Sequence, residues 1–229
     1  MSVPRKPHFD SWRIFRILSE FVDGFETMTD IGPSVSIFGS ARTDPSRPYY
    51  KLGTEVAEKI AKKGIGIITG GGGGIMEAAN KGAQNVKGRS CGMSINLPFE
   101  ETSNPYLDRK YDLRFRYFFV RKVMFVRYAQ AFVVLPGGVG TLDELFEAMT
   151  LIQTKKIKPF PIFLMGKSYW EGLIEWLKAV PLQEKYISQT DFDLFTLTDD
   201  PQEVADAIER HYQKVGKAPT FPLGTEDEY

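Results

Sequence analysis

The sequence contains very few of the side chains that most catalytic centres and cross-linked folds require. Its 229 residues include one cysteine, Cys91, and two histidines, His8 and His211. One cysteine cannot form an internal disulfide. Zinc-ligand sets, Cys–His pairs and Ser–His–Asp triads each lack a member. Any chemistry must therefore use carboxylates, Arg, Lys, hydroxyls and backbone groups, and we expect neither a metal site nor a cofactor.

The sequence also lacks an excess of charge and any long apolar run. Lys plus Arg and Asp plus Glu each number 29, so the formal net charge is zero and the basic surface of a duplex-binding protein is missing. No apolar run approaches the ~20 residues that span a bilayer. The first residues, Met1 to Lys6, lack the apolar core of a signal peptide. We therefore expect a cytoplasmic protein with no nucleic-acid partner and no membrane partner.

Apolar residues make up 42% of the chain and aromatic residues 13%, which is enough for a substantial core. Short apolar runs, rich in β-branched residues, alternate with segments of helical periodicity. We predict helices over 8–27, 48–63, 75–83, 142–153, 169–177 and 201–213, and strands over 34–38, 65–69, 90–97, 131–135 and 161–166. This alternation predicts an α/β fold with a doubly wound, mostly parallel sheet covered by helices on both faces.

The pattern has no internal repeat and no linker long enough to divide the main domain. We assign 1–32 to an N-terminal helical extension, 33–215 to a nucleotide-binding catalytic domain and 216–229 to a flexible tail. The helix over 8–27 is amphipathic. It is expected to pack on the domain or across a subunit interface, or else to lie on a membrane surface. Its acidic residues argue against an anionic membrane: Glu20, Asp23 and Glu26.

Three predicted strands end in glycine-rich turns: Gly39-Ser40, Gly70 to Gly74, and Pro136 to Thr141. The carboxyl ends of parallel strands lie along one edge of a sheet, where ligands bind, so one pocket could use all three turns. The five-glycine turn matches neither a P-loop nor a dinucleotide fingerprint. It is either a flexible turn or a place where the backbone closely approaches a ligand or a neighbouring loop. Residues 104–108 are predicted to form a surface segment able to cover this site.

The third turn leads into a helix and is the candidate phosphate site. Free N–H groups at a helix N-terminus, together with the helix dipole, favour an anion. Glu144 follows Thr141 by three residues, which fits a capping box as well as a catalytic carboxylate facing a sugar. Arg121 lies in a basic and aromatic segment, 114–129. Arg121 is either a nucleotide contact, a surface cation, or a partner for Asp143 or Glu144.

These motifs together resemble those of the LOG (LONELY GUY) family, long labelled lysine decarboxylase. The resemblance spans about 34–180 and rests on four ordered segments: Gly39 to Arg42, Gly72 to Glu77, Arg121-Lys122, and Pro136 to Glu144. Many plant members have Met-His before the Arg-Lys pair, where this chain has Phe118 to Val120, and they lack the long N-terminal helix. Both differences resemble the larger bacterial subgroup.

The resemblance implies a Rossmann-like homo-oligomer, at least a dimer, that hydrolyses the N-glycosidic bond of AMP-like or N6-modified, cytokinin-type nucleoside 5′-monophosphates. It implies that Arg121 and Glu144 form the catalytic pair. Together with the glycine turns, it predicts substrate or phosphate contacts at Gly39, Ser40, Gly73, Met76, Glu100, Lys122, Gly137, Gly138, Val139, Gly140, Thr141, Asp143 and Thr150. The alternative is a non-catalytic carrier of nucleotide or molybdenum cofactor with the same fold. Single-stranded DNA binding, as in a related fold, is disfavoured by the zero net charge.

Overall fold

A computed structural model of the chain describes residues 9–96 and 103–216. Within these ranges seven strands form one sheet in the order β4-β3-β2-β1-β5-β6-β7, and every neighbouring pair is parallel. The strands are β1 (Ser34–Phe38), β2 (Gly66–Thr69), β3 (Ser90–Ile95), β4 (Asp112–Phe115), β5 (Ala129–Val134), β6 (Ile162–Leu164) and β7 (Thr196–Leu197). The prediction of an α/β fold with a parallel sheet is confirmed.

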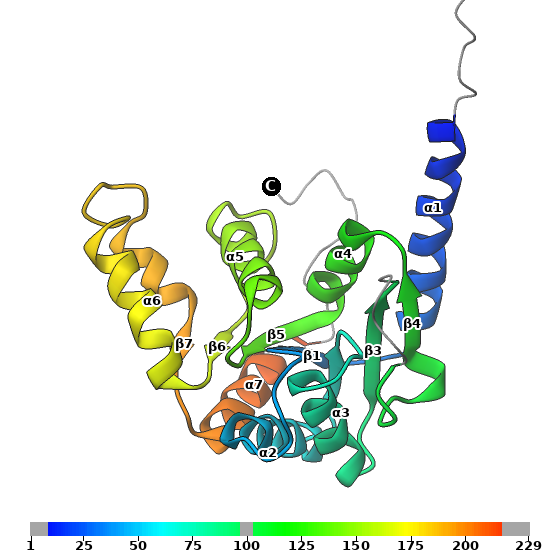
Figure 1. The fold of residues 1–229 in the computed structure, drawn as a ribbon, viewed down its shortest axis with the longest axis horizontal. Helices are drawn as coiled ribbons and strands as arrows, with labels where there is room; N and C mark the ends of the chain where they lie inside the picture. Colours follow the sequence, from blue (N-terminus) through cyan, green and yellow to red (C-terminus); the bar gives the residue numbers. More distant parts are fainter. Residues whose placement is uncertain (1–8, 97–102, 217–229) are drawn as a thin grey trace, which may run out of the picture.

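Helices cover both faces of the sheet (Figure 1). One layer holds α2 (Pro48–Lys62), α3 (Ile75–Asn85) and α7 (Pro201–Val215). The other holds α1 (Phe9–Met28), α4 (Phe118–Tyr128), α5 (Val139–Gln153) and α6 (Lys167–Ala179). Two 3₁₀ helices are η1 (Arg109–Tyr111) and η2 (Gln189–Leu194). Each layer closes its own apolar core, one around Ile67 and Val133, the other around Phe125, Phe132 and Trp170.

The central strands are buried on both faces, and their few polar residues, Ser34, Ser36 and Thr69, are buried as well. All five residues of β1 and all four of β2 are buried. The edge strands differ, and the sequence pattern predicts neither of them. β4 alternates exposed and buried residues over four positions, and β7 has only two residues. Strands of four and two residues are too short for an alternating pattern to distinguish them from the loops around them.

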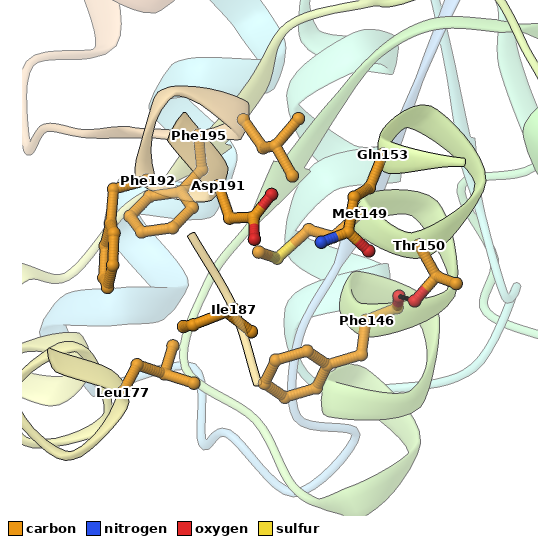
Figure 2. A pocket seen from close by; sticks show the side chains of 10 residues that line it. Phe146, Met149, Thr150, Gln153, Leu177, Ile187, Asp191, Phe192 and Phe195 are labelled. Carbon is orange, nitrogen blue, oxygen red and sulfur yellow. Dashed lines mark hydrogen bonds between the residues drawn. The ribbon is translucent and has the colours of Figure 1, made fainter. Parts of the chain in front are cut away.

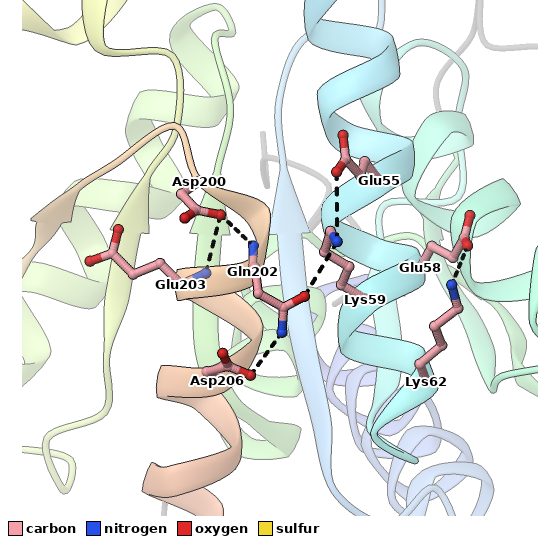
Figure 3. Close-up of polar contacts among 8 residues, drawn as sticks. All are labelled: Glu55, Glu58, Lys59, Lys62, Asp200, Gln202, Glu203 and Asp206. Atoms are coloured by element: carbon pink, nitrogen blue, oxygen red, sulfur yellow. Dashed lines mark hydrogen bonds and ion pairs between the residues drawn. The ribbon is translucent and has the colours of Figure 1, made fainter.

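Helices α2 and α7 are joined by polar contacts on the surface of their layer (Figure 3). Lys59 Nζ donates to Gln202 Oε1 at 3.3 Å. Asp200 caps α7, accepting from the backbone N–H groups of Gln202 at 2.8 Å and Glu203 at 3.3 Å. The Lys59–Gln202 bond thus links the two helices, whereas the Asp200 cap satisfies N–H groups at the start of α7 itself.

The chain reverses its direction across the sheet between β1 and β5. From β1 to β4 each new strand is added on one side of β1, and β5 to β7 are added on the other side. The connections that leave the carboxyl ends of β1 and β5 therefore lead in opposite directions. Such a topological switch point is where open α/β sheets bind their ligands. No helix in the described parts of the chain is both long and apolar enough to cross a bilayer.

The two glycines inside helices α3 and α6 have opposite surroundings. A Cβ at Gly82 would overlap the Thr54 carbonyl oxygen of α2 and lie 3.0 Å from Glu58 N, whereas nothing lies within 4 Å of a Cβ at Gly172. We expect Gly82→Ala to lower the free energy of unfolding by about 1–3 kcal/mol through overpacking. Gly172→Ala, the matched control, should raise it by about 0.5–1 kcal/mol. Urea denaturation of both variants measures this; equal shifts would contradict the close packing of α2 on α3.

Candidate functional site

The three glycine-rich turns are joined by backbone hydrogen bonds at the carboxyl edge of the sheet. The N–H of Ser40, after β1, donates to the carbonyl oxygen of Pro136, after β5, at 3.0 Å. The carbonyl oxygen of Ser40 accepts from the N–H of Ile75, which begins α3, at 3.0 Å. The β1 turn thus holds both neighbouring turns, and the structure brings Gly39, Ser40, the five-glycine turn and the Pro136 turn together.

Close packing between these turns explains why several positions are glycine. Gly74 has a φ of +63°, and a Cβ there would overlap Ser40 O and lie 2.6 Å from Ala41 C. A Cβ at Gly39 would lie 2.6 Å from Ile75 Cγ2. At Gly73 the nearest atom would be Ala41 O at 3.6 Å, which is ordinary contact. The backbone of the five-glycine turn therefore lies close to the neighbouring loop after β1, as one of the predicted alternatives requires.

A buried polar network fixes the same turn from the other side. Asn104 Nδ2 donates to the carbonyl oxygens of Gly71 and Gly72 at 3.1 and 3.0 Å, and to Asn80 Oδ1 at 3.0 Å. Thr69 Oγ1 donates to Asn80 Oδ1 at 2.6 Å. The segment that begins at residue 103 is thus anchored to the glycine turn. Glu100, one of the predicted contacts, lies outside the described residues.

Helix α5 begins three residues earlier than predicted, and this excludes the capping box. Its N-cap is Gly138 and carries no side-chain cap. The N–H of Thr141 donates to the Gly138 carbonyl oxygen at 3.0 Å, so Thr141 lies inside the first turn. The Thr141 side chain is 7% exposed and packs against Gly137. The capping-box interpretation of Thr141 and Glu144 is therefore wrong, because a residue inside the helix cannot serve as its N-cap.

The N-terminus of α5 is open to solvent. Nothing lies within 4 Å of a Cβ built at Gly138 or Gly140, and Val139 is 84% exposed. The first N–H groups of a helix have no partner inside it, and the helix dipole favours a negative charge beside them. Tyr169 of α6 fixes the turn, because its hydroxyl donates to the Gly137 carbonyl oxygen at 2.5 Å. This arrangement can accept an anion the size of a phosphate.

Tyr169 was not among the predicted site residues. In the sequence Tyr169 is marked only as an aromatic residue near the start of α6, the helix that follows β6. Its contact with Gly137 depends on the parallel register of β5 with β6.

One lysine on α4 links three carboxylates on α5. Lys122 Nζ lies 2.6 Å from Glu147 Oε2, 2.9 Å from Asp143 Oδ2 and 3.8 Å from Glu144 Oε2. Burial alone would lower the pKa of Lys122, but its hydrogen bonds to Glu147 and Asp143 outweigh this and raise the pKa. Glu147 was missed as a site residue, although its spacing from Asp143 and Glu144 puts it on the same side of a helix.

Glu144 is the buried member of this cluster, with 6% of its surface exposed. Burial raises its pKa to about 7, the charges of Lys122 and Arg121 oppose this shift, and those of Glu147 and Asp143 add to it. The carboxyl group can therefore be protonated or ionised near neutral pH, which suits a general acid or base.

Arg121 lies beside the five-glycine turn. A Cβ built at Gly70 would be 3.8 Å from Arg121 Nη1 and 2.7 Å from Met76 Sδ. The guanidinium lies 5.1 Å from the Phe118 ring and 5.5 Å from the Phe125 ring, within the range of cation–π contacts. Its charge also reaches Glu144. The predicted pair Arg121 and Glu144, together with Met76, therefore lies between the second and third glycine turns.

Two hollows lie along α5. The larger, of about 720 Å³, is lined in part by Lys122, Val139, Asp143 and Thr150, so four predicted contacts share it. The smaller, of about 100 Å³, lies between α5, α6 and residues 187–195 (Figure 2). Its lining is mostly apolar, with Phe146, Leu177, Ile187 and Phe192 around it. Neither Arg121 nor Glu144 lines either hollow, and the charged lining residues Lys122, Asp143 and Glu147 belong to the larger one, which is therefore the better candidate.

The described residues contain no group of three or more His, Cys, Asp and Glu side chains placed to hold a metal ion. Cys91, the second residue of β3, is fully buried, and burial raises the pKa of its thiol well above the ordinary range.

The chain is similar to proteins of known sequence and structure. Residues 76–208 match a family model described as possible lysine decarboxylase. The chain is 31% identical to a cytokinin riboside 5′-monophosphate phosphoribohydrolase from Mycobacterium tuberculosis, over 69% of this chain and 82% of that protein. It is 25% identical to a probable cytokinin riboside 5′-monophosphate phosphoribohydrolase from Oryza sativa, over 77% and 70% of the two chains. The molybdenum cofactor carrier protein from Chlamydomonas reinhardtii has a similar fold, with a TM-score of 0.54 and 17% identity over 79% of this chain and 99% of that one.

The raised pKa of Glu144 predicts a pH-dependent stability. Because the pKa is about 7 in the folded protein against 4.5 for a free Glu, the protonated carboxyl is favoured by folding. This contribution is complete below pH 4.5 and is lost as the pH rises through 7. Relative to Glu144→Gln, the wild type should lose on the order of 3 kcal/mol of unfolding free energy between pH 4.5 and 8.

Urea denaturation at several pH values measures this difference. Glu171→Gln, at an exposed position of α6, is the matched control and should follow the wild type at each pH. A difference between wild type and Glu144→Gln that is constant with pH would contradict the assigned ionisation.

Proposed function

This chain belongs to the LOG family, whose model is described as possible lysine decarboxylase, and we propose that it is a nucleotide phosphoribohydrolase. In this proposal it hydrolyses the N-glycosidic bond of AMP or an N6-modified, cytokinin-type nucleoside 5′-monophosphate to free base and ribose 5-phosphate. The observation that carries the proposal is a buried carboxylate, Glu144, with a pKa of about 7, beside Arg121 and on the helix whose open N-terminus can accept a phosphate.

The distance along α5 suits a ribose phosphate. Glu144 follows Val139 by five residues, which is about 7.5 Å along a helix axis. A 5′-phosphate on the N–H groups at the start of α5 would thus leave the ribose ring near the Glu144 carboxylate. Binding energy from the phosphate can then position a sugar that the helix end does not itself touch.

Cleavage of a ribosyl–base bond builds positive charge on the sugar. A carboxylate beside C1′ stabilises the oxocarbenium-like transition state and can accept a proton from the attacking water. We assign this role to ionised Glu144. Lys122 and Arg121 oppose the effect of burial, so that a useful fraction of Glu144 is ionised at neutral pH. We assign Arg121 to the leaving base or the attacking water.

The proposed partners are a nucleoside monophosphate and further copies of the chain, at least a second, in the cytoplasm. The zero net charge argues against nucleic acid. A carrier of molybdenum cofactor, as for the fold relative from Chlamydomonas, is the alternative function. The presence of both Arg121 and Glu144 around one site favours hydrolysis, and saturable nucleotide binding without base release would favour the carrier.

We expect Glu144→Gln to lower the rate of base release from AMP by 10³-fold or more, on the order of 4 kcal/mol, because the amide cannot stabilise the sugar cation. The assay incubates the protein with purine and pyrimidine monophosphates and measures free base and ribose 5-phosphate. Glu171→Gln, which removes an exposed carboxylate on α6, should retain the wild-type rate. Base release by Glu144→Gln at the wild-type rate would refute the assignment.

Val139→Asp tests the phosphate position. Because Val139 is 84% exposed, a new carboxylate there should leave the fold intact while repelling a phosphate at the helix N-terminus. We expect the KM for AMP to rise about 10-fold, equivalent to ~1.4 kcal/mol. Val139→Asn has the same shape without the charge and should change the KM far less. Equal effects of Asp and Asn on the KM would place the phosphate elsewhere.

A further inference from the structure

The turn before α5 contains two adjacent glycines, Gly137 and Gly138, so its own backbone constrains it weakly. Packing requires the first of them, because a Cβ at Gly137 would overlap Thr141 Oγ1 and lie 2.9 Å from Ser40 N. Glycine adopts positive as well as negative φ values, and the peptide unit between two glycines can therefore rotate at low energetic cost. The orientation of this unit consequently depends on contacts from outside the turn.

The two polar groups of this peptide unit act on a phosphate in opposite ways. The N–H of Gly138 attracts an anion, whereas the carbonyl oxygen of Gly137 repels one. No peptide bond in the described parts of the chain is cis, so these two groups point in opposite directions. A rotated unit would therefore turn a repelling oxygen toward the place where the N–H now lies.

Tyr169 holds the unit in one orientation. Its hydroxyl donates to the Gly137 carbonyl oxygen at 2.5 Å, which directs this oxygen toward α6. The N–H of Gly138 then points away from α6, at an exposed position of the turn. We propose that Tyr169 is a positioning residue for the 5′-phosphate, because its hydroxyl keeps the Gly138 N–H directed to the phosphate and the Gly137 oxygen away from it. This inference rests on the proposed function.

Tyr169 is itself held in place by contacts at the start of α6. The Asp199 carboxylate, which follows β7, accepts from the backbone N–H groups of Gly166 at 2.6 Å and Lys167 at 3.0 Å. The same helix start packs on the turn, since a Cβ at Gly166 would lie 2.9 Å from Pro136 Cγ. A side chain on a helix start fixed in this way can impose an orientation on a turn that has little rigidity of its own.

Mutation can separate the ring of Tyr169 from its hydroxyl. The ring packs edge-to-face on that of Trp170, with centroids 4.8 Å apart, and Tyr169→Phe keeps this contact while it removes the hydroxyl. Tyr49→Phe is the matched control. The Tyr49 hydroxyl also contacts the start of α6, but it forms its hydrogen bond with Ser168 Oγ, at 3.1 Å, rather than with the turn.

The first experiment measures the kinetics of base release from AMP. We expect Tyr169→Phe to raise the KM about 5-fold, as for the loss of one hydrogen bond, and to change kcat by less than about two-fold, because the phosphate is bound equally before and during cleavage. Tyr49→Phe should keep the wild-type KM. Circular dichroism melting checks that both variants are folded.

Product inhibition distinguishes positioning of the phosphate from a general loosening of the site. The inhibition constant of ribose 5-phosphate should rise in Tyr169→Phe by the same factor as the KM, and that of adenine, which has no phosphate, should stay at the wild-type value. An unchanged KM, equal changes for the two products, or the same changes in Tyr49→Phe overturns the proposal.

Calorimetric titration with ribose 5-phosphate keeps this test separate from that of the hydrolase activity. Weaker binding by Tyr169→Phe, with wild-type binding by Tyr49→Phe, supports the positioning role whether or not the wild type releases base. Equal KM values for AMP in an active wild type and an active Tyr169→Phe variant overturn the positioning role and leave the hydrolase proposal intact. A wild type that does not bind ribose 5-phosphate also overturns the positioning role.

Discussion

The candidate site depends on the two hydrogen bonds that the backbone of Ser40 makes at the switch point of the sheet. Its N–H holds the turn after β5 and its carbonyl oxygen holds the start of α3. Both bonds require the chains to approach so closely that a Cβ at Gly39 or Gly74 would collide with a neighbouring turn. The glycines at 39 and 74 therefore bring the three turns together, whereas the backbone at Gly138 to Gly140 is open to solvent.

The electrostatics of the site rest on one shared cation. Lys122 is closer to Asp143 and Glu147 than to Glu144, so most of its charge is neutralised by the two more exposed carboxylates. Burial is then the largest influence on Glu144, and it raises the pKa of this carboxyl from 4.5 to about 7. The charges of Lys122 and Arg121 lower the pKa of Glu144, and the neighbouring carboxylates Glu147 and Asp143 raise it, so burial keeps the larger effect.

Helix α4 connects the candidate site to the edge of the sheet. It holds Arg121 and Lys122 toward the glycine turns, and α1 packs on α4 beside β4 (Figure 1).

Much of the fold follows from the sequence, because the buried parallel strands are rich in apolar β-branched residues and the long helices are strongly periodic. β1 is found at 34–38, as predicted, and α1 within one residue of its predicted ends. The start of α5 was placed three residues late, since glycines at 138 and 140 have low helix propensity and conceal a helix that tertiary contacts hold in place. The two edge strands were too short to predict.

The sequence by itself determined which residues have the chemistry for a site: three glycine turns, one Arg-Lys pair and a run of carboxylates. It could not distinguish a helix cap from a catalytic carboxylate at Glu144, because spacing alone fits both. The tertiary structure excludes the cap, because α5 begins at Val139, and it buries Glu144 among charges from α4 and α5, which supports the catalytic role that we propose. The burial of Glu144 and its proximity to Lys122 and Arg121 result from packing between α4 and α5, which are separate segments of the chain. Spacing within one segment therefore cannot predict them.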